Sequence, residues 1–385
     1  MLKKEYKICY IANSTVPSQT ANSFQVMKMC DGFAGLGMDV ILLLPKNENI
    51  KSFYILKDFY SLSNNFDIEY LMRLKTDRLS NFSYALSVLI YVLRKLGKKV
   101  IYYTRNELIA LWLARLGFPV IYETHQFNYG NKSIDSKIQK RVLKLSSLPA
   151  LLFIVSISNM LKMKWLQVGV PEEKIFVLHD AVDLERFFNL PEKETLRKEI
   201  GLPIEKFIVT YCGKISKDRG IEILLETALR LKDVYFLIIG GREKEIINEF
   251  KEYVIKRKIE NVLFTGFVEN KIVPKYLKAS DVLVMLHTDA CLIKDVTSPL
   301  KLFEYLAAGK PIIACDLPAI KEILKDEENA LLIKPSVSDL IKGIKRIRQD
   351  NKLIRKIEEN NFQLAQKYTW KNRCEKIIDL ISRYQ

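Results

Sequence analysis

Short apolar runs alternate with longer segments of helical periodicity from one end of the chain to the other. Apolar runs of this length are typical of parallel strands joined by helices, and strands that are apolar almost throughout have helices on both faces. The predicted strands lie at residues 7–12, 39–45, 67–72, 99–104, 119–124 and 151–158, and then at 207–214, 234–241, 261–267, 281–287, 311–316 and 330–335. Helices predicted at 22–35 and 107–116 end just before Gly37 and Gly117, where left-handed caps are expected. The pattern predicts an α/β protein with one parallel sheet in each half of the chain.

A polar, turn-rich segment at residues 179–206 interrupts this alternation, and Pro191 and Pro203 bracket a short charged helix within it. We place the domain boundary in this segment, which gives an N-terminal domain at 1–185 and a C-terminal domain at 186–365. Both domains are expected to be doubly wound and Rossmann-like, and such sheets bind ligands beyond the carboxyl ends of their strands. The expected architecture is two such domains facing each other across a cleft.

Composition narrows the class of protein. The 385 residues suffice for two domains with separate cores, and 49% hydrophobic with 28% charged residues excludes a disordered chain. The longest apolar run, at 82–93, is shorter than the roughly 20 residues of a membrane-spanning helix. Glu5 and Lys7 lie close to the first apolar run and no small-residue cleavage site follows, so we expect a cytoplasmic protein.

The formal net charge of +16 predicts an anionic partner. Nucleic acid is not expected, because no basic stretch is interleaved with stacking aromatic residues and no nucleic-acid-binding module is recognised. The six cysteines lie far apart without a CxxC motif, so reduced and mostly buried thiols are expected. With only three histidines in the chain, no metal site is expected.

Two basic segments could instead mark a surface. Residues 71–100 hold seven Lys or Arg against one acid and include an apolar helix with basic ends, which could lie on a membrane. The apolar residues run nearly all round this helix, however, and this favours a helix packed between neighbours. The basic run at 132–145 is interpreted as the solvated face of another helix.

The first stretch with candidate chemistry is "YCGKISKDRGIEILLETAL" at 211–229. A strand ends at Gly213, Lys214 follows, and Arg219 directly precedes an amphipathic helix. Such a loop presents backbone N–H groups and the positive end of a helix dipole to an anion, and the two cations add charge where a diphosphate would bind. A solvated loop before a helix has the same features and, taken alone, is the more common case.

The second stretch is "TSPLKLFEYLAAGK" at 297–310. Ser298 and Pro299 are preferred N-cap and N1 residues, so a helix is expected to begin there. Lys301 and Glu304 are three positions apart and share one face of that helix. A carboxylate at Glu304 can accept hydrogen bonds from the hydroxyls of a ribose, and a surface ion pair with Lys301 is the alternative.

The third candidate is His125, which follows the strand predicted at 119–124. A lone histidine is more often structural than catalytic. Its position at the carboxyl end of a strand favours contact with a ligand.

The order of these segments carries a resemblance. From "CGKISKDRGIEILLE" through "LIIGG", "VLFTGFV" and "YLKASDVLVMLH" to "SPLKLFEYLAAGKPIIACDLPAIKEIL" and "ALLIKP", residues 205–345 strongly resemble the C-terminal domain of glycosyltransferase family 4, which comprises retaining enzymes of the GT-B fold. The final "YTWKNRCEKIIDLI" is similar to the family's terminal helix, so residues 366–385 are expected to pack on the N-terminal domain. The resemblance implies hexosyl transfer from a nucleotide-sugar to a glycan, lipid-linked or protein-linked acceptor, in surface polysaccharide or glycoconjugate synthesis. It also implies retention of anomeric configuration and no metal or other cofactor.

The resemblance implies roles for individual residues. Lys214 and Arg219 match the basic pair that neutralises the donor diphosphate, whose developing charge needs fixed cations when no metal is present. His125 matches a histidine beside the transferred sugar, where it would bind a hydroxyl rather than act as a general base. The implied donor-binding positions are Gly213, Gly240, Gly241, Phe267, Val268, Ser298, Leu300, Lys301 and Glu304, the last on ribose hydroxyls.

This sequence departs from the family's pattern in three places. The first of two usual glutamates would stand at Val296, and Asp295 is one position away, so recognition of the 3- and 4-hydroxyls of the donor sugar must differ. Lys214 stands where arginine is common; it keeps the charge and lacks the bidentate fork. A usual glycine pair in the first domain is replaced by a loop in which Ala21, Asn22 and Ser23 are expected to take over.

Two other functions remain open from the sequence. A nucleotide-sugar 2-epimerase has the same architecture, although it would need more acids and histidines in the cleft than this chain offers. A non-catalytic subunit that binds a sugar nucleotide is the third reading, because the first glutamate is missing. The basic first domain could also contact anionic lipids at the inner face of a membrane.

Overall fold

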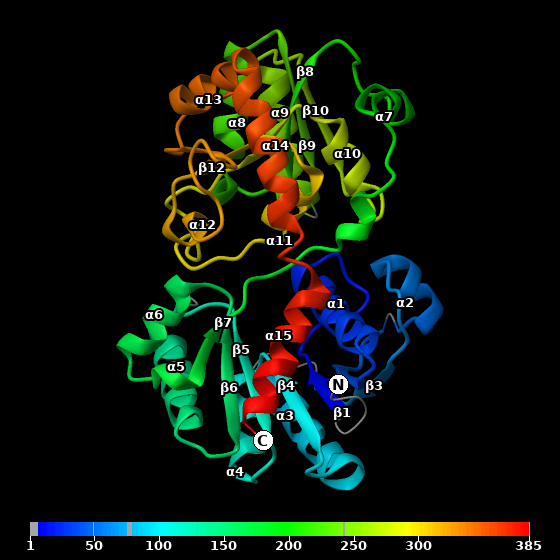
Figure 1. Ribbon diagram of the computed structural model, residues 1–385, viewed down its shortest axis with the longest axis vertical. Helices are drawn as coiled ribbons and strands as arrows, with labels where there is room; N and C mark the ends of the chain where they lie inside the picture. Colours follow the sequence, from blue (N-terminus) through cyan, green and yellow to red (C-terminus); the bar gives the residue numbers. More distant parts are fainter. Residues whose placement is uncertain (1–6, 49, 75–78, 129, 242, 385) are drawn as a thin grey trace. The chain divides into compact units, whose positions relative to one another are not determined.

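The computed structural model describes residues 7–48, 50–74, 79–128, 130–241 and 243–384, which form two compact units (Figure 1). Unit 1 comprises Met1–Asp180 and Trp370–Gln385, and unit 2 comprises Ala181–Thr369. The division lies five residues before the predicted boundary, and the terminal segment joins unit 1 four residues later than predicted. The reason is a main-chain contact within unit 2: the N–H of Val182 donates to the carbonyl of Tyr368 at 2.8 Å.

Unit 1 is built on a seven-stranded parallel sheet with the order β3-β2-β1-β4-β5-β6-β7. Its strands are β1 Lys7–Ile11, β2 Asp39–Pro45, β3 Asp67–Leu71, β4 Val100–Thr104, β5 Val120–Thr124, β6 Leu151–Ser156 and β7 Ile175–Val177. Its helices are α1 Ala21–Gly35, α2 Phe53–Tyr60, α3 Ser80–Tyr91, α4 Glu107–Arg115, α5 Lys132–Ser146, α6 Asn159–Gln167 and α15 Trp370–Arg383; a π-helical turn, Val92–Leu96, continues α3, and a 3₁₀ turn, Glu172–Lys174, precedes β7. Every residue of β4, β5 and β6 is buried, so helices cover both faces of the sheet, as predicted.

Unit 2 is built on a six-stranded parallel sheet with the order β10-β9-β8-β11-β12-β13. Its strands are β8 Phe207–Cys212, β9 Val234–Ile239, β10 Val262–Gly266, β11 Val282–Met285, β12 Ile312–Cys315 and β13 Leu331–Ile333. Its helices are α7 Lys193–Glu199, α8 Ile221–Arg230, α9 Lys244–Lys256, α10 Val273–Ala279, α11 Leu300–Ala308, α12 Pro318–Lys321, α13 Val337–Gln349 and α14 Asn351–Ala365, with 3₁₀ turns at Leu184–Phe187 and Lys217–Arg219. Alternate residues of one strand enter two separate cores: Ile208 packs in one and Val209 in the other.

The twelve predicted strand segments each contain a strand, whereas β7 was not predicted. Only three residues long, β7 has one fully buried side chain, Ile175, and offers little apolar pattern. Gly37 and Gly117 follow α1 and α4 with φ of 82° and 78°, which confirms the predicted caps.

The start of α11 differs from the prediction by one residue. Pro299, not Ser298, is the N-cap residue, and the helix begins at Leu300. Pro299 has the extended backbone angles φ −75° and ψ 129°. It was expected to be the first helical residue, and it instead precedes the helix. At the other end Gly309 has a left-handed φ of 63°, as the sequence indicated.

The terminal helix α15 packs against α1 in unit 1. The backbones come close because of Gly32: a Cβ at this position would lie 2.8 Å from Cys374 Sγ. Helix α15 also places Arg373 inside the unit, with 4% of its surface exposed. All six cysteines, Cys374 among them, are buried free thiols.

The expectation that the apolar helix within residues 71–100 is packed between neighbours is wrong for one of its faces. Tyr84, Ala85 and Val88 face the interior, but Phe82 and Ile90 are 49% and 43% exposed. The prediction failed because the exposed face of this helix is as apolar as its packed face. Among the helices that the structure describes, none is long and apolar enough to cross a membrane.

Candidate functional site

Two loops of unit 2 leave the sheet where its strand order reverses. Strands β9 and β10 lie on one side of β8, and β11, β12 and β13 lie on the other. Loops that follow adjacent strands on the two sides of such a point diverge and leave a crevice that binds ligands. The loop after β8 carries Lys214 and Arg219, and the loop after β11 leads to α11. The sheet therefore places the two predicted stretches at neighbouring strand ends.

The loop after β8 is held by contacts within unit 2. The hydroxyl of Tyr211 donates to the carbonyl of Lys214 at 2.6 Å, and the N–H of Thr288, after β11, donates to the carbonyl of Asp218 at 3.1 Å. Arg219 Nε lies 3.4 Å from Asp218 Oδ2 in an ion pair but donates no hydrogen bond within the described residues. Lys214 is exposed, whereas the Arg219 side chain is 17% exposed. Arg219 is thus a partly buried cation with a donor left over.

Gly240 lies against the same loop. It follows β9 with φ of 114°, and a Cβ there would lie 2.2 Å from the carbonyl oxygen of Gly213. A side chain at Gly241 would meet Ile247 at 2.6 Å. Close approach of two backbones is the reason for glycine at 240, and the role of the two glycines near a nucleotide stays a prediction.

We expect Gly240→Ala to destabilise unit 2 by about 3 kcal/mol or more, because the methyl group would overlap a main-chain oxygen and the backbone would be strained. Gly266→Ala is the matched control: it also has a positive φ, of 70°, but no atom lies within 4 Å of its Cβ position. The control should cost about 1 kcal/mol. Urea unfolding of both variants measures the difference in the free energy of unfolding. Equal destabilisation would contradict the prediction, because it would mean that the backbone at Gly213 moves aside without a free-energy cost.

Lys301 of α11 completes a cluster of cations. Its Nζ lies 4.2 Å from the centroid of the Tyr211 ring and 3.5 Å from the position of a Cβ on Gly213. Burial and then the charge of Arg219 lower the pKa of Lys301 to about 7. Because two cations share a site of low polarity, an anion bound between them would be stabilised by both.

His287 is a functional candidate that sequence reasoning missed. It lies two residues after the end of β11, is 1% exposed, and neither ring nitrogen has a hydrogen-bond partner within the described residues. Burial, Lys301 and Arg219 together lower the pKa of His287 to about 2, so the ring is neutral. The rule that selected His125, a histidine at the carboxyl end of a strand, could have selected this one. A buried, unpartnered imidazole beside two cations is a costly arrangement that a ligand would relieve.

Glu304 forms an ion pair with a residue that the sequence did not indicate. Its Oε1 lies 3.6 Å from Nη1 of Arg186, and Lys301 lies over Tyr211, so the alternative of a Lys301–Glu304 ion pair is wrong. Burial raises the pKa of Glu304, and Arg186 opposes this effect. The Glu304 side chain is 17% exposed, so the proposed contact with a ribose remains sterically open.

The other predicted donor positions have different surroundings. Ser298 is buried, Leu300 and Val268 are partly buried, and Phe267 is 41% exposed. Val296, at the position of the missing glutamate, is a buried apolar side chain, while its neighbour Asp295 is exposed. No group of three His, Cys, Asp or Glu side chains in the described part of the chain could hold a metal ion.

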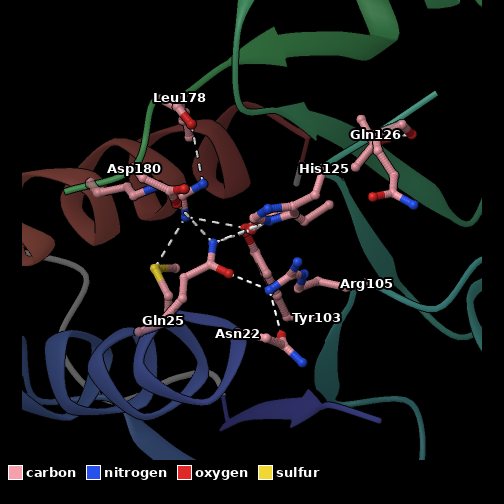
Figure 2. Close-up of polar contacts among 12 residues, drawn as sticks. Asn22, Gln25, Tyr103, Arg105, His125, Gln126, Leu178 and Asp180 are labelled. Atoms are coloured by element: carbon pink, nitrogen blue, oxygen red, sulfur yellow. Dashed lines mark hydrogen bonds and ion pairs between the residues drawn. The ribbon is translucent and has the colours of Figure 1, made fainter. Parts of the chain in front are cut away.

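Unit 1 holds a second polar cluster around Glu123 of β5, shown in Figure 2. Glu123 is 1% exposed and accepts hydrogen bonds from Arg373 Nη1 at 3.1 Å, from Gln25 Nε2 at 2.6 Å and from the hydroxyl of Tyr103. His125 Nε2 also contacts this carboxylate. Burial alone would raise the pKa of Glu123, but Arg373, His125 and Arg105 together lower it well below its ordinary value. Glu123 is therefore a buried carboxylate that stays ionised.

The hydrogens of Gln25 determine the tautomer of His125. Arg105 donates to Gln25 Oε1, which fixes the orientation of the amide. The two hydrogens on Nε2 are then taken by Glu123 Oε1 and by Asp180 Oδ1 at 3.0 Å. Nε2 of His125, 3.2 Å from the same amide nitrogen, must carry its own hydrogen and donate it to Glu123. The opposite ring nitrogen, Nδ1, is left as a hydrogen-bond acceptor.

We expect ¹⁵N spectra of histidine-labelled protein to show His125 as the neutral Nε2–H tautomer. Burial and Arg105 lower its pKa to about 4, so this signal should persist well below pH 6. His179 is an internal control with the opposite tautomer, because its Nδ1 lies 2.9 Å from the carbonyl of Ile157 and must donate. Glu123→Gln should mix the His125 tautomers and leave His179 unchanged. A protonated His125 at pH 6 would contradict the arrangement.

The predicted loop residues of unit 1 lie at the start of α1. Thr20 is the N-cap and accepts from the N–H of Ser23 at 3.2 Å, while Ala21 is the first helical residue. Asn22 Oδ1 accepts from Arg105 Nη1 at 2.6 Å and so joins the cluster around Glu123 (Figure 2). The Ser23 hydroxyl is turned inward and donates to the carbonyl of Ser18 at 2.6 Å. Of the three, Asn22 is the one that the structure brings to the other polar residues.

Comparison with known proteins agrees with the chemistry of unit 2. Residues 192–364 match the family described as glycosyl transferases group 1. Unit 2 thus contains the segment that is similar to this family. The match covers the loop after β8, the glycines after β9 and all of α11, so Lys214, Arg219 and Glu304 all lie inside the matched segment.

Curated relatives extend the similarity. The chain is 25% identical over 238 residues to an uncharacterized glycosyltransferase of Methanocaldococcus jannaschii, with 59% of each chain covered. It is 27% identical over 243 residues to TuaH, a putative teichuronic acid biosynthesis glycosyltransferase of Bacillus subtilis, with 57% of this chain and 58% of that protein covered. The matched part thus spans less than two thirds of these relatives.

Solved structures share the fold of the whole chain. HepE of Anabaena has a TM-score of 0.77 at 16% identity, covering 98% of this chain and 99% of that chain. Sucrose-phosphate synthase of Thermosynechococcus elongatus has a TM-score of 0.79 at 17% identity, covering 98% of each. The predicted α/β fold of the GT-B type, with two doubly wound parallel sheets, is confirmed.

Proposed function

We propose that the protein is a retaining glycosyltransferase that moves a hexose from a nucleotide-sugar to a glycan, lipid-linked or protein-linked acceptor in surface polysaccharide or glycoconjugate synthesis. The observation that carries the proposal is the cluster of Arg219, Lys301 and His287 at the strand ends of unit 2, where cations face a buried imidazole without a partner. Related solved structures contain UDP and UDP-glucose, which supports a nucleotide-sugar donor.

Each residue has a task in this proposal. Arg219 and Lys301, with Lys214 at the open end of the loop, stabilise the charge that develops on the leaving diphosphate, a role that fixed cations fill without a metal ion. Gly213 and Gly240 let the backbone approach the nucleotide, and Glu304 accepts from the ribose. The acceptor hydroxyl gives its proton to the departing phosphate oxygen. In unit 1, His125 offers Nδ1 to a hydroxyl of the substrate, so it positions the substrate and does not remove a proton.

The test is incubation of the purified chain with a panel of UDP-, GDP- and ADP-sugars, with and without EDTA. We expect one base to bind, slow release of nucleoside diphosphate, and the same rate in EDTA. Product analysis separates transfer from epimerisation, because only transfer or hydrolysis frees the nucleotide. A folded protein that binds none of these nucleotides would overturn the proposal.

Binding of the diphosphate is expected to take up a proton. The pKa of Lys301 in the free protein is about 7, and a bound diphosphate would raise it, so the bound state holds more protons than the free state above pH 7. Affinity should therefore fall at least tenfold between pH 7 and pH 9, as measured by titration calorimetry in two buffers of different ionisation enthalpy. Lys301→Arg keeps the charge at every pH and should remove the dependence. An unchanged slope in that variant would assign the proton to another group.

A further inference from the structure

Helix α3 of unit 1 has one packed and one open face (Figure 1, cyan). The packed face consists of Tyr84, Ala85 and Val88, and Val92 of the following π-helical turn continues it. On the open face lie Leu79, Phe82, Leu86, Ile90 and Leu93, which we name the α3 stripe. Its members are spaced by three or four residues and therefore lie along one side of the helix.

The α3 stripe is large and apolar. The exposed fractions run from 43% at Ile90 to 58% at Leu93, and Phe82 touches the ring of Trp112 in α4 at a centroid distance of 5.4 Å. Single exposed apolar side chains are ordinary, but five in a row on one helix are not. Such a continuous face indicates a surface that is covered in the working protein.

The charged residues at the C-terminal end of the helix indicate what kind of surface covers the α3 stripe. Arg94, Lys95, Lys98 and Lys99 are exposed at the C-terminal end, and residues 79–100 contain no Asp or Glu. Among the described residues, Glu69 and Asp67 of β3 interact electrostatically with Tyr91, at the flank of the stripe. An apolar helix face with adjacent cations and no acids of its own complements a surface that is both apolar and anionic.

A second copy of this chain fits the face less well. Two identical subunits related by a twofold axis bring the same patch against itself. Where the basic ends met, such pairing would bury cations against cations without acids to compensate. A bilayer supplies acyl chains for the stripe and phosphate groups for the cations at once.

We propose that the α3 stripe docks on the surface of an anionic lipid bilayer, with the apolar side chains among the outer acyl chains and Arg94, Lys95, Lys98 and Lys99 on the head-group phosphates. The helix lies along the surface and does not cross it. The proposal is independent of the transferase activity, since no residue of the polar clusters in either unit takes part.

Flotation of the full chain with vesicles tests the proposal. Vesicles of phosphatidylcholine with 30% phosphatidylglycerol should bind the protein, and pure phosphatidylcholine should bind it at least tenfold less. Phe82→Ser/Ile90→Ser should reduce binding at least tenfold while the variant remains folded, because both side chains are about half exposed. Its melting temperature checks the fold, since Phe82 also contacts Trp112. Lys95→Gln/Lys98→Gln should remove the preference for the anionic lipid. Ile255→Ser is the matched control: Ile255 is 75% exposed on α9 of unit 2 and should leave binding unchanged.

Two outcomes would overturn the proposal. One is failure of the wild-type chain to bind anionic vesicles, or equal binding by wild type and Phe82→Ser/Ile90→Ser. The other is a dimer in sedimentation velocity that the same double variant converts to a monomer, which would assign the face to a second copy of the chain. Nucleotide binding measured in the same samples reports on the transferase proposal separately.

Discussion

Arg219→Ala should weaken binding of the donor nucleotide by about a hundredfold and lower the transfer rate by a similar or larger factor. Arg219 is a partly buried cation whose Nε has no hydrogen-bond partner within the described residues, so its donors are available to a phosphate. A charge-assisted hydrogen bond in such a site contributes about 1.5–3 kcal/mol, and loss of a donor that stabilises a leaving group costs about 10²–10³ in rate. Titration calorimetry and steady-state kinetics measure the two effects.

The same loop supplies the control. Lys217 lies two residues away with 71% of its side chain exposed, 3.6 Å from Glu249. Because solvent screens this ion pair, Lys217→Ala should change nucleotide affinity less than threefold. Arg219→Lys should recover part of the affinity, since it keeps the charge and loses the fork. Equal effects at both positions would mean that general positive charge, rather than the site after β8, attracts the nucleotide.

Arg373→Met should destabilise unit 1 by about 3–5 kcal/mol, the usual cost of leaving a buried charge without its partner. The Arg373 guanidinium donates to Glu123 Oε2 at 3.1 Å, to the carbonyl of His179 at 2.9 Å and to the carbonyl of Leu178 at 3.1 Å. Glu123 would remain buried and ionised among neutral donors. Urea unfolding at pH 7 measures the loss, and Lys371→Met, on the exposed side of α15, should have little effect.

A second variant separates charge from packing. Glu123→Gln in the Arg373→Met background removes the unpaired carboxylate and should recover about half of the lost stability.

The pH dependence of the stability has a definite sign. Arg373 holds the pKa of Glu123 below its ordinary value, so the stability from this pair is present above about pH 4.5 and is lost as the pH falls through the depressed value. The deficit of Arg373→Met should therefore be largest near neutrality and shrink in acid. A deficit that does not vary with pH would indicate that Arg373 acts by packing alone.

The Glu123–Arg373 pair explains why a helix from the end of the chain belongs to unit 1. Arg373 donates to Glu123, the carboxylate that also accepts from His125. Helix α15 therefore helps to determine the tautomer of His125, which lies far earlier in the chain. Truncation of α15 would expose the face of α1 around Gly32 and leave Glu123 without its cation. In the proposed function, truncation would thus impair the contact between His125 and the substrate although His125 itself is retained.

Val296 occupies the position at which the family pattern has a glutamate. In the family pattern an acid would stand there, yet the structure buries Val296 with 4% exposure and leaves Asp295 exposed on the loop. Two polar side chains that the structure places at or near α11 are His287, which is neutral, and Lys301, whose pKa is lowered to about 7. We expect hydroxyl recognition of the donor sugar to rely on them more than on a carboxylate.

The sequence by itself determined the strands, the class of fold and the loops that bear charge. These features are local: apolar runs such as 151–155 favour a buried strand, and Gly37 or Gly309 adopts a left-handed φ because of the neighbouring helix end. The sequence also identified Arg219 and Glu304 as candidate site residues, because the order of the motifs can be read along the chain without knowing the distances between side chains.

Only the tertiary structure decided which side chains meet. Gln25, Glu123, Asp180 and Arg373 come from four separate parts of the chain, and their hydrogen bonds depend on the register of β5 and on the packing of α15 against α1. The same holds for Arg186 beside Glu304, for the buried and unpartnered ring of His287, and for the open face of α3. Periodicity reports that a residue is apolar or charged, but burial and partnership are properties of the surfaces that folding brings together.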